Sequence, residues 1–459
     1  MKDQPVINVG IMSSPTIDFV LNGRFTCRRR VFRGAQRATV KGDEVIFAGM
    51  KAPEFVFRSK DATFTLNKVT IGVDFHWQRD EDQTFDGDLR LIAREGKVVA
   101  VNIVGVENYL MSVISSEMSA HASKQLLKAH AVISRSWVLS QISRKGDTEA
   151  HKNEMIDTEE EYIGWQDRED HTDFDVCADD HCQRYQGLTR ANTEAVVEAV
   201  KETWGEVRMV KEGRKKVLCD TRFSKCCGGM LEQFRYCWEN VRHSYLISRR
   251  DSVRACAMPD LTDEETVRHW IMNSPVSFCN TTDGKILSQV LNNYDQETAN
   301  FYRWKVEYTQ QEISELIRRR TGIDFGSIID LVPVARGTSG RIWKLKILGT
   351  KRTRIIGKEL AIRRALSPTH LYSSAFVVEK PSVAIVSQIT GKVLSEEEIA
   401  SGKFVSLAAA PEKFILYGAG WGHGVGLCQI GAAVMGEQGY DYREILEHYY
   451  PSSQLTEKY

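Results

Sequence analysis

The sequence predicts an α+β protein, in which a β-rich N-terminal region precedes a mixed helix and strand core with an inserted helix-rich segment. Residues 1–104 contain short runs rich in Val, Ile, Phe and Thr, separated by Gly, Asp and Lys, which is typical of strands joined by turns. From residue 105 onward, runs with the apolar spacing of helices alternate with strand-like runs. The chain has 459 residues, enough for two or three domains.

The order of these runs divides the chain into four segments. They are a β-rich region over residues 1–104, the first part of the core over 105–245, a helix and strand insert over 246–350, and the second part of the core, with a glycine-rich loop, over 351–459. Within the first part of the core, residues 143–175 are polar and acidic. They predict a long loop beside a cleft, and a solvated spacer is the alternative.

Composition excludes some classes of protein. Lys and Arg number 61, as do Asp and Glu, so the net charge is zero, which argues against nucleic-acid binding. No apolar run reaches the roughly 20 residues that a membrane span needs. The first residues lack the pattern of a signal peptide, so either a signal was removed or the protein acts inside the cell. The 10 cysteines are too dilute for a disulfide scaffold.

Residues 106–137 predict two helices separated by a turn. The first has one apolar stripe, and Ser119 is expected to cap the second. Glu117 then lies at a helix end beside a packed seam, where burial raises the pKa of a carboxyl group. A glutamate in such a place can act as a general acid near neutral pH. The alternative is that the Glu117 side chain merely caps the second helix.

Later elements follow from caps, periodicity and turns. Helices are expected over 191–205, 263–271, 309–322, 360–366 and 442–451, a hairpin over 330–349, and a strand, a glycine-rich loop and a helix over 414–435. The glycine-rich loop carries His423, which a ligand could approach closely. A structural histidine bonded to the backbone is the alternative.

His171, Cys177 and Cys182 lie close together in the sequence. Two thiolates and an imidazole can supply three ligands of a tetrahedral zinc site. A Cys177–Cys182 disulfide and unrelated thiols are the alternatives, and His181 is a rival third ligand. A Cys237–Cys256 disulfide is a further possibility in an oxidising compartment.

Several of these runs match one family pattern. The matching runs are Glu107-Asn-Tyr-Leu110, Ser116-Glu-Met118, Leu127-Lys-Ala-His-Ala-Val132, Gly228-Gly229, Arg336-Gly-Thr-Ser-Gly-Arg341 and Gly420-Trp-Gly-His-Gly-Val-Gly426. Together they resemble the signature of the SpoIID/LytB family of sporulation and cell-wall proteins. Departures from the pattern are Ser119, His130, Trp137, Leu427 and Cys428, and Lys225, Cys226 and Cys227 stand where serines are usual.

The resemblance implies a peptidoglycan lytic transglycosylase, a carbon–oxygen lyase that cleaves the bond between N-acetylmuramic acid (MurNAc) and N-acetylglucosamine (GlcNAc). Such an enzyme leaves a 1,6-anhydroMurNAc end, and one carboxyl group, here Glu117, serves as acid and then as base. Candidates for substrate binding are Lys128, Arg135, Tyr185, Gln186, Ser224 and His423. Some family members carry a His and two Cys at the place of His171, Cys177 and Cys182, which implies a structural Zn²⁺ that the chemistry itself does not require.

Two other functions remain open on the sequence. One is a SpoIID-like protein that binds glycan without cleaving it, and the other is a zinc-dependent hydrolase. The resemblance implies an extracytoplasmic location in the periplasm or cell envelope, whereas the absence of a signal peptide favours the cytoplasm.

Overall fold

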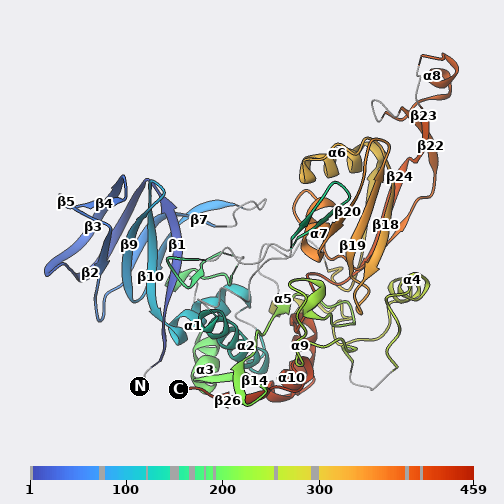
Figure 1. The fold of residues 1–459 in the computed structure, drawn as a ribbon. Helices are drawn as coiled ribbons and strands as arrows, with labels where there is room; N and C mark the ends of the chain where they lie inside the picture. The colour runs from blue at the N-terminus through green and yellow to red at the C-terminus, as the bar shows by residue number, and fades with distance from the viewer. Residues whose placement is uncertain are drawn as a thin grey trace.

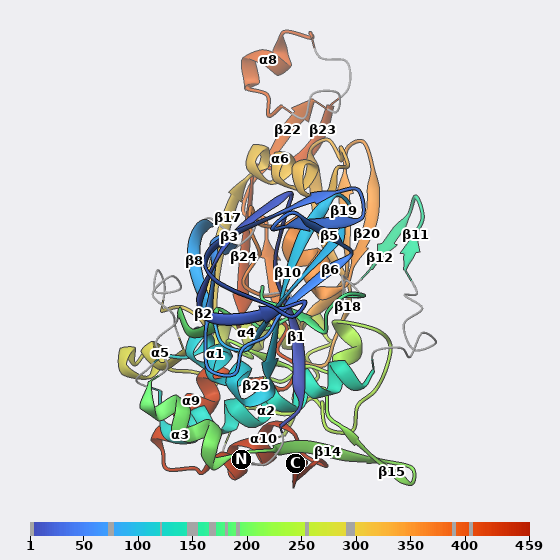
Figure 2. The same cartoon turned by 90° about the vertical axis from the view of Figure 1, so that its left-hand side faces the viewer.

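The computed structural model describes residues 4–71, 78–119, 122–144, 155–164, 171–179, 182–189, 193–252, 257–290, 299–387, 392–403 and 407–459. Three regions lie side by side in Figure 1: a β-rich N-terminal region, a central group of helices near both chain ends, and a second β-containing region. Figure 2 shows the same arrangement with the N-terminal strands in front of the second β region. The predicted α+β class with a β-rich N-terminus is confirmed.

The N-terminal region consists of two sheets with a shared core. Its strands are β1 (Val6–Ser14), β2 (Thr16–Cys27), β3 (Arg30–Lys41), β4 (Glu44–Phe47), β5 (Met50–Ala52), β6 (Glu54–Phe57), β7 (Phe64–Ile71), β8 (Arg79–Phe85), β9 (Asp88–Arg94) and β10 (Lys97–Gly105). One sheet has the order β5-β4-β3-β2-β7-β8 and the other has the order β13-β1-β10-β9-β6, where β13 is Val176–Cys177. Because side chains alternate between the two faces of a strand, one face buries several phenylalanines. Among them, Phe47 and Phe57 meet edge to face with their ring centres 4.9 Å apart.

The central region is helical. Its helices are α1 (Val106–Glu117), α2 (Lys124–Ser143), α3 (Glu194–Glu202), α9 (Gln429–Glu437) and α10 (Tyr442–Tyr449), with the short helices η1 (Gly187–Thr189) and η2 (Phe234–Tyr236). Two small sheets accompany them, β15-β14-β26 (Lys215–Leu218, Glu206–Glu212, Gln454–Glu457) and β16-β25 (Phe223–Ser224, Leu427–Cys428). One hydrophobic core joins these helices to the N-terminal sheets, so α1 and α2 are packed on both sides.

The second β region is built from segments on both sides of residue 350. Its elements are α4 (Glu264–Asn273), β17 (Arg303–Thr309), α6 (Gln310–Thr321), β18 (Ile328–Arg336), β19 (Ile342–Gly349), β20 (Thr353–Gly357), α7 (Glu359–Ala365), β21 (Phe376–Glu379), β22 (Val383–Ser387), α8 (Glu396–Ala400), β23 (Leu407–Pro411) and β24 (Lys413–Ala419). Helix α5 (Gly284–Val290) lies in the same stretch of sequence but packs into the core of the central helices. β17 pairs with β24, and β19 pairs with β20, across a separate hydrophobic core. The predicted division at residue 350 therefore falls in the turn between β19 and β20.

Local signals predicted several elements well. Helix α6 has the expected capping box, in which Thr309 and Glu312 exchange hydrogen bonds, and Gly322 ends it at a positive φ. The expected cap of the second core helix was wrong: Ser123, not Ser119, accepts the hydrogen bond at the start of α2. The Ser119 N–H instead donates to the Gln289 carbonyl, 2.9 Å away, because α5 packs against this turn.

Part of the polar stretch 143–175 is regular structure. Strands β11 (Ile156–Asp157) and β12 (Glu161–Ile163) extend the second β region, where β12 runs parallel to β20. Strand β13 runs parallel to β1 at the edge of the N-terminal sheet. The end of this stretch is thus held by backbone pairing. Among the described residues, no helix combines the length and apolar character needed to cross a membrane.

Candidate functional site

Glu117 is the last residue of α1, and its side chain is half-buried. The helix ends there because Met118 turns to an extended conformation, with its N–H still bonded to the Ile114 carbonyl. The apolar face of α1 is fully packed, and Met118 and Ala122 continue the same core through the turn that follows. Glu117 therefore stands where a packed helix opens into the α1–α2 turn.

Tyr109 lies on the buried side of α1, among several predicted site residues. Its ring stacks on Tyr185 at 5.1 Å, and its hydroxyl donates to Gln183, 3.1 Å away. Burial raises the pKa of Tyr109 well above its usual value, and the nearby Cys182, Cys177, Tyr185 and Glu117 add to the shift. Glu117 and the two thiols therefore lie close enough to Tyr109 to affect its pKa.

Tyr185 and Gln186 lie behind this site rather than on its surface. Each is only 2% exposed. The Tyr185 hydroxyl donates to Asn102, 2.6 Å away, and the backbone N–H of Gln186 donates to the Ser112 hydroxyl of α1, 3.2 Å away. Both therefore fix the chain against β10 and α1, and neither presents a polar atom to a sugar in this conformation.

His171, Cys177 and Cys182 meet in space as the sequence predicted. Their ligand atoms all lie within 4.8 Å of one another, and the Cys182 Sγ is 3.5 Å from His171 Nε2. Neighbouring ligand atoms of a tetrahedral zinc site are about 3.5 Å apart, so these residues fit the metal. Cys177 and Cys182 are not joined by a disulfide, so the structure does not support the disulfide alternative. His181 lies outside the described residues, as does Cys256 of the other possible disulfide.

The chain around these ligands is anchored to the N-terminal sheet. Cys177 pairs with Gly10 in the β1–β13 ladder, and Asp175 accepts hydrogen bonds from the backbone and side chain of Asn8. Asp173 forms an ion pair with Arg94 at 2.6 Å. The segment that carries His171, Cys177 and Cys182 is consequently held in place by contacts that do not depend on a metal.

Lys128 and Arg135 bind protein groups instead of facing a cleft. Lys128 forms an ion pair with Glu202 of α3 and lies 5.4 Å from the centre of the Tyr442 ring. Arg135 has no exposed surface and forms a bidentate ion pair with Glu107, with distances of 2.8 and 2.6 Å. The structure thus gives Arg135 a packing role, because no sugar can reach its guanidinium.

The glycine-rich loop between β24 and β25 meets two other motif segments. Glu232 is buried and accepts from the Ser339 hydroxyl, 2.7 Å away, while its N–H donates to the Gly424 carbonyl. Arg341 donates to the carbonyls of Gly422 and Cys227, each 3.2 Å away. The three motifs therefore form one hydrogen-bonded unit, with Glu232 and Arg341 as its buried polar centre.

The glycines of this loop make room for protein groups. Gly424 has a φ of +74°, and a Cβ there would clash with the Arg341 guanidinium. Gly426 has a φ of +72°, and a Cβ there would clash with the Arg222 carbonyl. A side chain is thus excluded by both the backbone conformation and the close approach.

His423 is held in one neutral tautomer. Its Nδ1 accepts from the Val425 N–H at 3.0 Å, and the ring also hydrogen-bonds the backbone of Phe223. Burial lowers the pKa of His423 well below its usual value, and Arg222, Arg341 and Arg363 lower it further. This arrangement corresponds to the alternative of a structural histidine bonded to the backbone.

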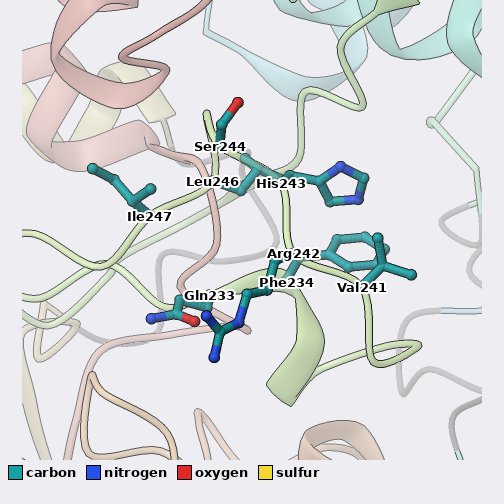
Figure 3. Close-up of a pocket in the computed structure, with 8 residues that line it drawn as sticks. All are labelled: Gln233, Phe234, Val241, Arg242, His243, Ser244, Leu246 and Ile247. Carbon is teal, nitrogen blue, oxygen red and sulfur yellow. The ribbon is translucent and has the colours of Figure 1, made fainter. Parts of the chain in front are cut away.

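Ser224 is 7% exposed on β16, and its hydroxyl has no hydrogen-bond partner among the described residues. Most of the predicted site residues thus fall into two groups, one on α1 and the 171–187 segment and the other around β16 and the glycine-rich loop, whereas Lys128 and Arg135 lie on α2 outside both. A hollow of about 370 Å³ is lined in part by Phe234, whose ring stacks on Trp238, which in turn packs against His423 (Figure 3). It is lined by Gln233, Phe234, Val241, Arg242, His243, Ser244, Leu246 and Ile247, none of which the sequence predicted as a site residue.

One group of side chains was not predicted from the sequence. Cys227, Asp251, Cys279 and Cys428 are all buried and bring their Sγ and carboxylate atoms within 4.8 Å of one another. The available signal was the replacement of the usual serines by cysteines at 226 and 227 and at 428. Their convergence with Asp251 and Cys279 could not be predicted, since no spacing rule connects such distant positions.

Two family models match the chain. Residues 94–209 match the model described as stage II sporulation protein, SpoIID, and residues 232–426 match a domain of unknown function, DUF8618. An uncharacterized protein of Brachyspira hyodysenteriae is 25% identical over 415 residues, which cover 90% of this chain and 78% of that protein. The amidase enhancer of Bacillus subtilis is 40% identical over 53 residues, which cover 12% of this chain and 8% of that protein.

The SpoIID match contains Glu117, both core helices and His171, Cys177 and Cys182. The signature runs on α1 and α2 lie in the same match, so the resemblance carried by these runs is confirmed. Residues 94–209 therefore carry a SpoIID domain match, and the partial match to the amidase enhancer is consistent with a SpoIID-like family.

Proposed function

We propose that this protein is a peptidoglycan lytic transglycosylase that cleaves MurNAc–GlcNAc bonds with Glu117 as its acid and base. The main support is the position of Glu117, half-buried at the end of α1, within the segment that matches the SpoIID model. The carboxyl end of a helix carries partial negative charge, which favours the neutral form of a carboxyl group there. A neutral Glu117 is the form that can donate a proton.

The reaction needs one carboxyl group. Glu117 donates its proton to the glycosidic oxygen as the bond from that oxygen to C1 of MurNAc breaks. The C6 hydroxyl of the same MurNAc then attacks C1, and its proton passes to the Glu117 carboxylate. Ordinary glycosidases use two carboxyl groups because they must activate water or form a covalent intermediate. Here the sugar supplies its own nucleophile, so the 1,6-anhydro product forms and Glu117 ends protonated.

The zinc ligands have a structural role in this proposal. His171, Cys177 and Cys182 would hold Zn²⁺ between the β1 edge and Tyr109 of α1. A bound zinc would supply cohesion to this loop, and no proton transfer depends on it. The packing beneath Glu117 would then be fixed from the side of the N-terminal sheet.

The test compares wild type with Glu117→Gln on purified sacculi and on glycan strands freed of stem peptides. We expect wild type to release fragments with 1,6-anhydroMurNAc ends, detected by mass spectrometry, and Glu117→Gln to lose at least a hundredfold in rate. Glu198→Gln is the matched control, because Glu198 is an exposed glutamate on α3. It should retain wild-type activity, and both variants should keep the wild-type melting temperature.

A folded Glu117→Gln variant that still releases anhydro ends would show that Glu117 is not the acid. If wild type releases nothing but sediments with sacculi, the protein binds glycan without cleaving it.

A zinc-dependent hydrolase remains the second candidate, since the three ligands leave a fourth coordination position for water. Its products would carry one additional water and an ordinary reducing end. Treatment with a chelator, followed by the same mass spectrometry, separates the two chemistries: anhydro products that persist exclude the hydrolase.

A further inference from the structure

Four buried side chains from four distant segments meet beside the glycine-rich loop. Cys227 follows β16, Asp251 lies in the segment before α4, Cys279 lies between α4 and α5, and Cys428 precedes the first residue of α9. Their relative exposures are at most 2%. Their ligand atoms lie within 4.8 Å of one another. The group is thus a compact, enclosed set of three sulfurs and one carboxylate.

The distances in this group match those of a metal-binding site. Cys227 Sγ lies 3.5 Å from Cys279 Sγ and 3.4 Å from Asp251 Oδ2. Around a tetrahedral zinc ion with bonds of about 2.0–2.3 Å, neighbouring ligand atoms are about 3.4–3.8 Å apart. A disulfide instead requires sulfurs about 2.05 Å apart. The observed spacing therefore corresponds to thiols around a common centre and not to a bonded pair.

Asp251 is oriented by groups outside the cluster. Its Oδ1 accepts from the Tyr449 hydroxyl at 2.9 Å and lies 3.3 Å from His448 Nε2. Its Oδ2, on the side facing the thiols, accepts hydrogen bonds from the Cys279 N–H and the Ser277 hydroxyl, each at 3.3 Å. Outer hydrogen bonds of this kind orient metal-ligating carboxylates. A carboxylate that is fully buried beside three sulfurs is costly unless a cation compensates it.

We propose that Cys227, Cys279, Cys428 and Asp251 hold one tetrahedral Zn²⁺ with a structural role. The thiolates favour zinc among the common divalent ions, and the carboxylate disfavours Cu(I), which prefers sulfur alone. All four positions are filled by protein and buried, which is the pattern of structural zinc sites. As the metal binds, each of the three thiols releases its proton to solvent, so the site forms with three thiolates and one carboxylate.

This zinc would fasten the insert to the core. Cys279 belongs to the segment between α4 and α5, whereas Cys428 is the last residue of β25 and Cys227 follows β16, the strand paired with it. The carbonyl of Cys227 also accepts from Arg341, which contacts the glycine-rich loop. The site is therefore placed to fix the loop that carries His423 relative to the insert. It is distinct from the His171, Cys177 and Cys182 ligands and does not depend on the proposed activity.

The experiment measures zinc per chain by plasma mass spectrometry on the purified full-length chain. A Cys177→Ser/Cys182→Ser background removes the first ligand group, and we expect it to retain one zinc per chain. Adding Cys279→Ser or Cys428→Ser should lower the content at least fivefold, and Asp251→Asn should weaken retention against a competing chelator at least tenfold. Cys27→Ser and Cys219→Ser are matched controls, because both thiols are buried outside the two groups, and these variants should keep the zinc.

A second measurement tests the proposal even if the Cys279→Ser and Cys428→Ser variants do not fold. In the Cys177→Ser/Cys182→Ser background with Co²⁺ in place of Zn²⁺, we expect sulfur-to-cobalt charge-transfer bands and the intense visible bands of tetrahedral cobalt. Bound metal should also protect Cys227, Cys279 and Cys428 from alkylation, and chelation should expose all three together, as peptide mass spectrometry can show.

Three results would overturn the proposal. They are a background variant that contains no zinc and gives no tetrahedral cobalt spectrum, a disulfide between Cys227 and Cys279, and full zinc retention in the folded Cys279→Ser variant. If Cys226→Ser loses its zinc while Asp251→Asn retains it in full, the fourth ligand is Cys226 and not Asp251. That result would contradict the assigned ligand set.

Discussion

His130 shows how a single buried residue couples this fold to pH. It is fully buried on α2, with Nδ1 3.2 Å from the Ser134 hydroxyl and Nε2 3.4 Å from the Gln429 amide nitrogen. Burial, aided by the charge of Lys225, lowers the pKa of His130 to about 3. An unfolded histidine has a pKa of about 6.5, so between these values the unfolded state binds the extra proton. The stability associated with a neutral His130 is therefore complete above about pH 6.5 and is lost as pH falls toward 3.

Replacing His130 with glutamine, the residue of the family pattern, should remove this pH dependence. Glutamine carries no titrating group and can still bond to Ser134 or Gln429. The slope of unfolding free energy against pH should fall by up to about 1.4 kcal/mol per pH unit between pH 4 and 6. Urea unfolding of both proteins at several pH values measures this slope. Above about pH 7.5, the difference in unfolding free energy between the two proteins should no longer change with pH. Parallel curves across the acid range would contradict the prediction.

Residue types and spacing predicted that His171, Cys177 and Cys182 lie together, but not that Lys128 and Arg135 pair with carboxylates of the protein. Spacing was sufficient for His171, Cys177 and Cys182 because they lie within one short loop, which cannot separate them widely. Arg135 was expected to bind sugar, yet its partner Glu107 is 28 residues away. A sequence shows that two opposite charges exist, but it does not show that they face each other in the core.

At the scale of elements, the ion pair between Glu107 and Arg135 holds α1 against α2. Both side chains are fully buried, and Glu107 also accepts from the Tyr459 hydroxyl at 2.6 Å and from the Gly205 N–H at 3.3 Å. Arg135 further donates to the Glu206 carbonyl, 2.9 Å away. One pair thus connects both core helices to the turn after α3 and to the last strand region.

Removing one member of this pair should cost much more than removing both. Arg135→Leu leaves a buried carboxylate, and we expect about 3–5 kcal/mol of lost stability. Arg135→Leu combined with Glu107→Leu should recover at least half of that loss, because no uncompensated charge remains. A double-mutant cycle by chemical denaturation measures the coupling. A substrate-binding role predicts a different result: Arg135→Leu would raise KM with an unchanged melting temperature.

The glycine-rich loop illustrates what local pattern can and cannot establish for an element. Its composition correctly predicted a loop between a strand and a helix, and the structure has β24, the loop and α9 in that order. The same composition suggested close approach of a ligand to His423. The structure shows that Arg341 and the Arg222 carbonyl occupy the space beside Gly424 and Gly426. Glycine marks a close approach, whereas the identity of the approaching group depends on the rest of the chain.

At the scale of the whole molecule, long-range pairing assembles the second β region. Strands β17 and β24 are neighbours although about a quarter of the chain separates them, and β12 joins β20 from the first part of the core. The proposed second zinc would act at the same scale, since its ligands come from the core and from the insert. Because distant segments pack into one region, the packed regions do not coincide with consecutive segments of the chain.

The sequence by itself determined the fold class, the capping box of α6, the hairpin at 330–349, the SpoIID resemblance and the proximity of His171, Cys177 and Cys182. Each of these depends on neighbouring residues, whose hydrogen bonds and periodicity are set locally. Only the tertiary structure decided that Arg135 pairs with Glu107, that the glycine-rich loop packs on Arg341, and that Cys227, Asp251, Cys279 and Cys428 meet. Such contacts arise when distant elements bury their apolar faces together, and no local pattern specifies which polar side chains then become neighbours.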